Sequence, residues 1–368
     1  MKTKQLSIPT LGLGAALSLA ACAQTPMSEA QLRAAVCPSP ELVEHAVCVC
    51  GDFSQTGRLT VKEGPAGVGS VGVNGVTDLV AQTQVSGSWY AWGGFSSVGQ
   101  TAFGPEAAIG GSLITPGDLS NVGTLSIAGD VHVGGDLDST GALTVGGMLG
   151  VRGTTDLVGE HQIASRGDYL APAAAPCGCD EASMFDVGQA VEAARISAGG
   201  ETSEELIGEA TVRLTTGAYY LKDPSSVGNA VHIIEGNVSL FVDGSLDSVG
   251  SAEWKIAPGG HLDLFVSGDV SHVGNLVAGS DADPDAFRLY VGGQSAAIDA
   301  VGESAFFGSI YAPQAMISYV GDTRVVGSIY AKQLDGVGDL TVEYGRPVLA
   351  PSSCDAPPAP PAPGGDAE

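Results

Sequence analysis

Glycine recurs at every sixth position through much of the first half of this chain. Stepping by six from Gly69 to Gly159 visits 16 positions, and 14 of them are Gly. Aliphatic residues recur between these glycines at a constant phase, for example at Leu125 and Ile127. Glycine tolerates tight turns, and alternating apolar residues are typical of strands with one buried face. Each hexad therefore predicts a short strand and a turn, and the repetition predicts a solenoid.

Charged residues follow the same alternation. All six between Gly111 and Gly159 have even numbers, whereas the in-phase aliphatic residues have odd numbers. Random placement would put all six on the even side about once in 64 trials (one half to the sixth power). We therefore expect odd-numbered side chains to point inward and even-numbered ones to face water. Three hexads would close one triangular coil of 18 residues, and coils stack about 4.8 Å apart.

The second half of the chain repeats at longer intervals. Leu240-Phe241-Val242 returns at Leu264 and, with Tyr in the middle, at Leu289, in steps of 24 and 25 residues. Gly308-Ser309-Ile310-Tyr311-Ala312 returns 19 residues later at Gly327. We predict an all-β fold in which a parallel β-helix forms two stacked or abutting units.

One helix is predicted between the two units, where it would cap an open solenoid end. Asp180 can begin it, and an apolar stripe at helical spacing ends at Gly199. The stripe consists of Met184, Val187, Val191 and Ala194. The predicted organisation is a signal peptide at 1–21, an anchor and Cys-containing segment at 22–66, a hexad-repeat β-helix at 67–165, a Cys-containing insert with the helix at 166–212, a second β-helix at 213–348 and a Pro-rich tail at 349–368.

Acidic residues dominate the charge of the chain. There are 41 Asp and Glu against 15 Lys and Arg, which gives a formal net charge of −26. Binding to nucleic acid requires clustered basic residues, and the sequence contains no such cluster. Nucleic acid is therefore not an expected partner.

The N-terminus resembles the signal peptide of bacterial lipoproteins. Lys2 and Lys4 precede an apolar run at 11–20 that is too short to span a bilayer as a helix. The run leads into Leu19-Ala20-Ala21-Cys22, which resembles a lipobox; the alternative is an ordinary signal peptide with an incidental Cys22. The resemblance implies lipidation of Cys22. Because Ala23 rather than Asp follows, it also implies attachment to the outer membrane, on its periplasmic or its outer side.

Two further resemblances concern the repeats. The Leu-x-Val-x-Gly rhythm of 111–159 resembles bactofilins, a family of polymer-forming bacterial β-helices. That resemblance implies a right-handed β-helix and self-association, although export and the Cys-containing insertions depart from the family. The runs at 214–220 and 307–313, with the shorter return at Gly327, resemble a domain of unknown function in bacterial surface and pilus-associated proteins.

Six cysteines remain after Cys22, and all lie outside the repeats. An even number in an exported chain predicts disulfides, with 15 pairings open. Neighbours in a Cys-x-Cys pair are expected to bond elsewhere, because a bridge between them would be strained. The alternative is a zinc site made by the four thiolates of the two Cys-x-Cys pairs. The candidates are Cys37, Cys48, Cys50, Cys177, Cys179 and Cys354.

Four aspartates of the first unit form a candidate cation ladder. Asp118 and Asp136 are 18 residues apart, as are Asp138 and Asp156, so each pair would stack in coils of 18 residues. Stacked carboxylates can hold calcium, and two carboxylates can serve a glycosidase. The alternative is a solvated acidic face.

A shorter acidic motif lies in the second unit. Asp281, Asp283 and Asp285 resemble the start of a calcium loop, but the closing Glu is missing and Pro284 interrupts the motif. Calcium is the only cofactor that the sequence suggests.

Aromatic residues cluster near the start of the hexads. By parity, Trp89 and Phe95 point inward, and Tyr90 and Trp92 point outward. The outward pair can stack on sugar rings, or it can be covered by the N-terminal segment or the helix.

Catalytic motifs such as Gly-x-Ser-x-Gly and His-Glu-x-x-His are absent from the sequence. His132 is the sole His inside the regular repeat, and we expect it at the surface. The sequence favours a non-enzymatic, lipid-anchored scaffold of the cell envelope that associates with itself. The alternatives are a carbohydrate-binding or adhesive module and a polysaccharide-cleaving enzyme. The expected partners are the membrane, through the lipid, and either further copies of the chain or an envelope polysaccharide.

Overall fold

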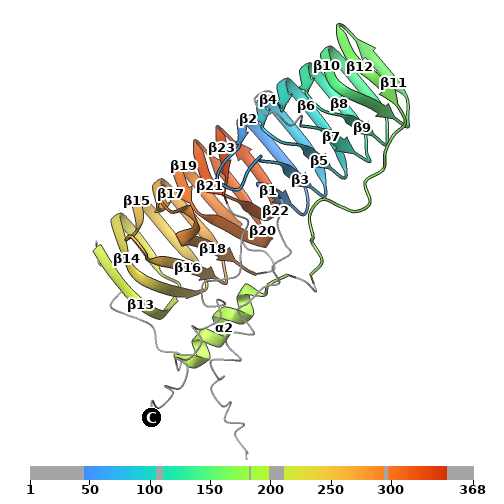
Figure 1. Ribbon diagram of the computed structural model, residues 1–368. Helices are drawn as coiled ribbons and strands as arrows, with labels where there is room; N and C mark the ends of the chain where they lie inside the picture. The colour runs from blue at the N-terminus through green and yellow to red at the C-terminus, as the bar shows by residue number, and fades with distance from the viewer. Residues whose placement is uncertain (1–44, 105–110, 182–183, 199–210, 294–296, 346–368) are drawn as a thin grey trace, which may run out of the picture.

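The computed structural model describes residues 45–104, 111–181, 184–198, 211–293 and 297–345. These residues form one continuous parallel β-solenoid of about twelve coils with an α-helix beside it (Figure 1). The predicted all-β, parallel β-helical fold is confirmed.

Twelve strands build the first unit. Short strands of three residues alternate with longer ones through most of it. The strands are β1 (Val47–Val49), β2 (Phe53–Lys62), β3 (Val71–Val73), β4 (Val76–Val85), β5 (Trp89–Ala91), β6 (Gly94–Phe103), β7 (Leu113–Thr115), β8 (Leu119–Ile127), β9 (Val131–Val133), β10 (Leu137–Val151), β11 (Thr155–Val158) and β12 (His161–Gly167).

Eleven strands build the second unit, which is less regular. A 3-10 turn, η2 (Pro284–Ala286), precedes one of them. The strands are β13 (Thr211–Lys222), β14 (Ser225–Asp243), β15 (Leu246–Ile256), β16 (His261–Val266), β17 (Val270–Gly279), β18 (Phe287–Val291), β19 (Ala297–Phe307), β20 (Ser309–Val320), β21 (Thr323–Gly327), β22 (Ile329–Val337) and β23 (Leu340–Tyr344).

Glycines bend the longer strands around the corner of the triangle. Gly99, Gly123 and Gly141 stack on one another, and their φ angles lie between 122° and 127°. A Cβ at Gly123 would lie 2.2 Å from the carbonyl oxygen of Gly99. Both the positive φ and the close stacking therefore require glycine at this corner.

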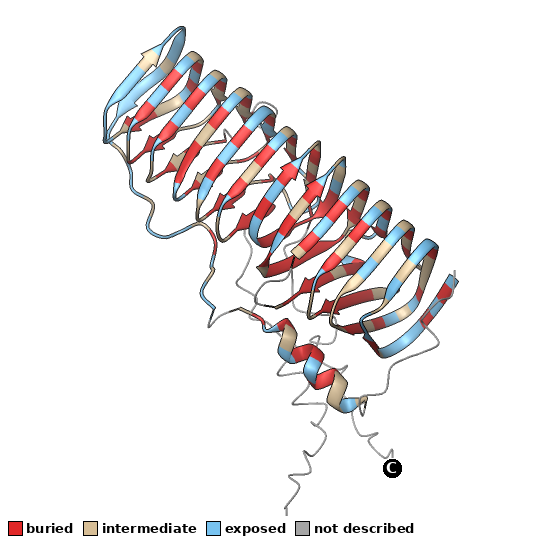
Figure 2. Cartoon of the chain, turned by 180° about the vertical axis from the view of Figure 1, so that it is seen from behind, coloured by how far each residue is buried: buried red, intermediate tan, exposed pale blue. Residues whose placement is uncertain are grey.

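The coil length differs in part from the predicted 18 residues. Leu119 pairs with Leu137 at a step of 18, whereas Phe53 pairs with Thr77 at a step of 24. A step of 24 adds one hexad, so the six-residue phase of the glycines and the inward parity survive the longer coils. Trp89 and Phe95 are accordingly buried in the core. Figure 2 shows the resulting bands, with buried and exposed residues alternating along the strands.

The two units join through the end of one and the start of the other. β22 of the second unit pairs with β1 in parallel, with Val47 opposite Ile329. β2 pairs with both β22 and β23. We call this contact the joint. β1 and β2 are the first coil of the solenoid, although the sequence analysis places them in the N-terminal segment before residue 67.

The α-helix, α2 (Val187–Ser197), begins later than expected and lies elsewhere. Its N-cap is Asp186, whose carboxylate accepts a hydrogen bond from the Gln189 backbone N–H at 2.9 Å, so Asp180 does not cap it. The helix packs along the side of the second unit, against β14 and β16, rather than across a solenoid end (Figure 1). Its buried face meets aromatic side chains on the outside of the coils, which explains the sideways position.

Candidate functional site

The segment between the two units returns along one side of the solenoid. It leaves β12 at the free end of the first unit, passes the joint and continues beside the second unit (Figure 1). We call residues 168–181 and 184–198, which include α2, the strap. The strap covers the face that carries the short strands β1, β3 and β9.

The strap first contacts the solenoid at β9. The Leu170 backbone N–H donates to Nδ1 of His132 at 3.3 Å, and the ring of Tyr169 meets the His132 ring edge-on. His132 is only 4% exposed as a result. The expectation that His132 lies at the surface is wrong, because parity reports the outward direction but not what covers it.

Two disulfides fasten the strap to β1 beside the joint. Cys48 bonds to Cys177 and Cys50 bonds to Cys179, with Cα–Cα distances of 5.8 and 5.7 Å. Cys48 and Cys50 alternate along a strand, so both sulfurs project from the same face. The prediction of disulfides is confirmed for these four residues, and the zinc alternative is wrong because their sulfurs are bonded in pairs.

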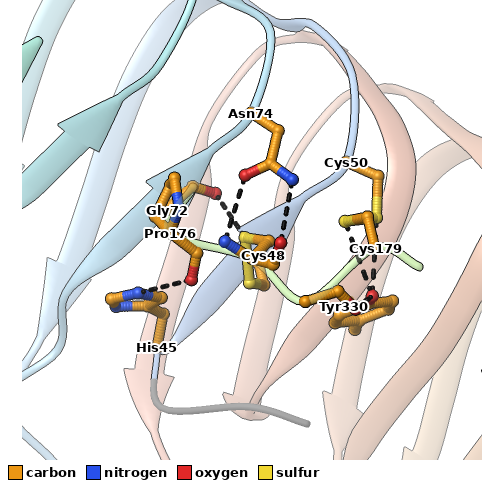
Figure 3. Close-up of a disulfide and its surroundings, with 10 residues drawn as sticks. His45, Cys48, Cys50, Gly72, Asn74, Pro176, Cys179 and Tyr330 are labelled. Carbon is orange, nitrogen blue, oxygen red and sulfur yellow. Dashed lines mark hydrogen bonds between the residues drawn. A yellow bond between two sulfur atoms is a disulfide. The ribbon is translucent and has the colours of Figure 1, made fainter. Parts of the chain in front are cut away.

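Hydrogen bonds hold the strap around the first disulfide (Figure 3). The Asn74 side chain donates to the carbonyl of Cys177 at 2.9 Å and accepts from its N–H at 3.0 Å. The Tyr330 hydroxyl donates to the carbonyl of Gly178 at 2.6 Å. The contact is close at Gly72, where an added Cβ would lie 2.8 Å from His45 and 3.0 Å from the Cys177 sulfur.

An outward column of aromatic side chains continues this face through the second unit. Its rings stack between neighbouring coils, with centroids 4.8 Å apart for Phe241 and Phe265 and 4.7 Å apart for Phe265 and Tyr290. Phe185 of the strap packs against the column, and its backbone N–H donates to the Tyr311 hydroxyl at 2.9 Å. In register order the column is Tyr220, Phe241, Phe265, Tyr290, Tyr311 and Tyr330.

Burial under the strap shifts the acidity of these phenols. It raises the pKa of Tyr311 to about 12. Burial and a 2.7 Å hydrogen bond to Asp243 raise the pKa of Tyr220 to about 12. These tyrosines stay neutral at physiological pH, so the column works as an apolar surface with polar ends.

The predicted sugar-binding pair lies at the edge of a groove beneath the strap. Trp92 is 36% exposed, and Tyr90 lies against the His45 ring. Together with Ile114 and the strap residues from Pro172 to Pro176, they line a groove of about 310 Å³. The pair is thus partly covered, by the strap rather than by the N-terminal segment or α2.

The acidic ladder stacks as predicted, but part of it binds the backbone. Oδ1 of Asp118 accepts from the N–H of Asp136 at 2.9 Å, and Oδ1 of Asp136 accepts from the N–H of Thr154 at 2.7 Å. The hydrogen bonds from Thr154 lower the pKa of Asp136. Asp138 pairs in register with Asp156 on the exposed face. Asp118 and Asp136 therefore tie each coil to the next at a corner.

The second acidic motif belongs to an ordinary turn. Asp283 begins η2, and Asp281 lies 3.6 Å from the Arg324 guanidinium. Asp285 is the second residue of η2. Among the residues that the structure describes, no three His, Cys, Asp or Glu side chains form a group that could hold a metal ion. The structure therefore assembles neither acidic motif into a metal centre, and the lipidation and disulfide candidates Cys22, Cys37 and Cys354 lie outside the described residues.

A cavity of about 240 Å³ lies inside the coils of β13 to β17. His232 stacks on Trp254 beside it, and burial lowers the pKa of His232 to about 4. Ser248 Oγ lies 2.7 Å from Nδ1 of His272, but Nε2 of His272 has no hydrogen-bond partner. This Ser–His contact lacks the carboxylate that orients the imidazole in a catalytic triad.

Comparisons with known proteins give limited information. Residues 180–348, under half of the chain, match a family described as a domain of unknown function (DUF7305). This match supports the resemblance of the second half to such a domain. No curated protein matches the chain.

One solved structure is similar at a low level. The competence-associated pilin ComZ from Thermus thermophilus aligns with 86% of this chain and 74% of its own, at 11% identity and a TM-score of 0.22. A score of this size does not establish a shared fold. Within the described residues, no helix is long and apolar enough to cross a membrane.

Proposed function

We propose that this chain is a non-enzymatic structural protein of the cell envelope, lipid-anchored through Cys22 to the outer membrane, that associates with further copies of itself. The observation that carries the proposal is the single rod. Two solenoid units dock end to start, and a strap bonded to β1 by two disulfides lies along the rod. A rod braced in this way suits a spacer or scaffold.

Three features support this function. Disulfides are typical of chains that fold in an oxidising compartment outside the cytosol. Asp136, which a glycosidase would need free, bonds to the backbone and hydroxyl of Thr154. The Ser248–His272 contact, as described above, lacks an orienting carboxylate.

The anchor is tested by comparing the native chain with the Cys22→Ser variant. We expect a diacylglycerol-sized mass increase on the peptide that begins at Cys22, and recovery of the native chain with outer membranes. The variant should lose the added mass and appear in the soluble envelope fraction. Recovery of both proteins in the soluble fraction, with no added mass, contradicts the anchor.

A second candidate function rests on the groove beside Trp92. Aromatic side chains at the edge of a groove of 310 Å³ suit a sugar ring, so the groove favours binding of an envelope polysaccharide. The test is a glycan array with the lipid-free chain. Trp92→Ala should abolish any signal, whereas Trp254→Ala should keep it, because Trp254 lies at the cavity inside the second unit. Binding that persists in the Trp92 variant excludes this groove.

A further inference from the structure

The outer surface carries a column of exposed β-branched residues along the whole rod. The residue directly before the bend of each longer strand is Val in ten coils and Thr in two, and each stacks in register on the next. All ten valines are between 45% and 89% exposed. From the far end of the second unit to the free end of the first, the column is Val227, Val249, Val273, Val301, Val320, Val337, Thr56, Val80, Val98, Val122, Thr140 and Val158.

A second column runs beside the first, two residues earlier in each strand. Every position holds Ser or Asp, so the two columns contain no basic residue. In the same order the column is Ser225, Asp247, Ser271, Asp299, Ser318, Asp335, Ser54, Asp78, Ser96, Ser120, Asp138 and Asp156. We call the two columns together the ladder face.

Strand propensity alone does not account for the valines. Thr prefers strands as Val does and leaves a hydroxyl in water, yet it occupies only two of the twelve positions. Eleven steps of about 4.8 Å give an apolar strip about 50 Å long. Continuous exposed apolar surface of this kind marks an interaction site.

We propose that the ladder face pairs with the ladder face of a second copy of this chain, antiparallel, about a two-fold axis at the joint. The inference deepens the self-association in the proposed function by naming the surface, and it needs no lipid anchor. The joint lies between coils six and seven of the twelve, so an axis there overlaps the two ladder faces completely.

The spacing of the ladder favours a second copy. Side chains that project every 4.8 Å interdigitate best with a partner of the same period, as stacked sheets do in steric zippers. A second solenoid has that period along its whole length. Valine would then meet valine in a strip from which water is excluded.

The Ser/Asp column is also complementary to itself in this orientation. The central coils place Asp335 opposite Ser54 of the partner, and Ser318 opposite Asp78 of the partner. The same axis sets Asp299 opposite Ser96 of the partner and Ser225 opposite Asp156 of the partner. Hydroxyl groups can donate to carboxylates at these four positions. Of the two remaining combinations, one joins two serines and one joins Asp247 to Asp138 of the partner.

The size of the face predicts a weak dimer. A strip about 50 Å by 10 Å buries about 1,000 Å² in total, at the lower limit for a specific interface. Each copy also carries a net charge of −26, so the two copies repel. We expect a dimer with a dissociation constant in the micromolar range or above, which tightens as salt screens the repulsion.

Sedimentation of the full chain with Cys22→Ser tests the interface. Val80 and Val320 face each other across the two-fold axis, so Val80→Lys with Val320→Lys sets Lys against Lys and should weaken the dimer at least about tenfold. Gln84→Lys with Thr124→Lys makes the same charge change on the neighbouring exposed face and should leave the dimer unchanged. Because both pairs reduce the net negative charge, loss of the dimer in the first pair alone identifies the ladder face.

Cross-linking tests the orientation. A chain with Val158→Cys is mixed with a chain with Val227→Cys and treated with a short thiol cross-linker. The antiparallel pair should link the two different chains, since these residues lie at opposite ends of the ladder. Links between identical chains, a strict monomer at every salt concentration, or a dimer that resists the lysine pair would each overturn the proposal. The anchor at Cys22 would be untouched by any of these results.

Discussion

Small residues set how closely the strap approaches the solenoid. The short-strand face carries Gly72 and Gly150 where the strap crosses it, and bulky rings where the strap stands further out. At Gly72 the strap lies in direct contact, and at Tyr90 it leaves the groove. The outward residue of each coil thus decides whether the strap touches the solenoid there.

Gly72→Ala tests this contact. An added Cβ would lie 2.8 Å from the His45 ring and 3.0 Å from the Cys177 sulfur, so we expect a loss of about 1–3 kcal/mol in the free energy of unfolding. Gly217→Ala is the control, because its Cβ would meet its nearest atom at an ordinary 3.6 Å. Urea unfolding measures both variants, and equal losses would contradict crowding at the strap.

His232 predicts an acid-sensitive step in stability. Its pKa is about 4 in the folded chain and about 6.5 in the unfolded chain, so the unfolded chain binds the proton first as pH falls. Stability is full above pH 6.5 and should fall by up to about 3 kcal/mol as the pH drops to 4.

His232→Phe keeps an aromatic ring on Trp254 and should remove this step from urea unfolding measured between pH 7 and 4. His161→Phe replaces an exposed histidine and should keep the step. Identical pH dependence in the two variants would exclude His232 as the source.

At the scale of elements, the two strap disulfides act as one clasp. Both close a loop of 129 residues, but once either has formed, the other closes only the few residues between them. Their contributions to stability should therefore not add.

Three variants test the clasp. Removing one bridge, by Cys48→Ser with Cys177→Ser or by Cys50→Ser with Cys179→Ser, should lower the free energy of unfolding by about 2 kcal/mol. Removing both should lower it by about 7 kcal/mol, more than the sum, because the long loop is then open. Thiol reduction of the native chain should reproduce the fourfold variant, and strict additivity in urea unfolding would contradict the shared loop.

The local repeat predicts the elements well, and long-range contacts explain the rest. The glycine phase and the parity correctly predict that Trp89 and Phe95 point inward, because both depend only on neighbouring residues. The outward aromatic column was missed, although the middle residue of each Leu-Phe-Val repeat carried the signal. Its burial depends on the strap, which arrives from a distant part of the chain. The disulfide partners and the sideways place of α2 depend on the strap in the same way.

At the scale of the whole molecule, both ends of the described chain reach one corner of the joint. The carbonyl of Ala46 accepts from the N–H of Ile329 at 2.9 Å, and the N–H of Gly345 donates to the carbonyl of Gly327 at 2.8 Å. No hexad or parity signal predicted this arrangement, because strands of the joint are separated by most of the sequence.

The two remaining cysteine candidates are expected to pair with each other. Cys37 and Cys354 lie outside the described residues, eight residues before His45 and nine after Gly345. Peptide mapping without reduction should yield one linked pair that contains both, alongside the two strap pairs. Free thiols at both positions, or a link between different chains, would contradict the expectation.

The joint also orders the maturation of the chain in time. The first coil emerges from export long before β22 and β23, so one edge of β1 and β2 stays open until the last strands have passed. Such an edge can recruit foreign strands during the wait. A chain cut short before β22 would keep the open edge for good, so aggregation rather than loss of a binding site is the expected failure of truncated products.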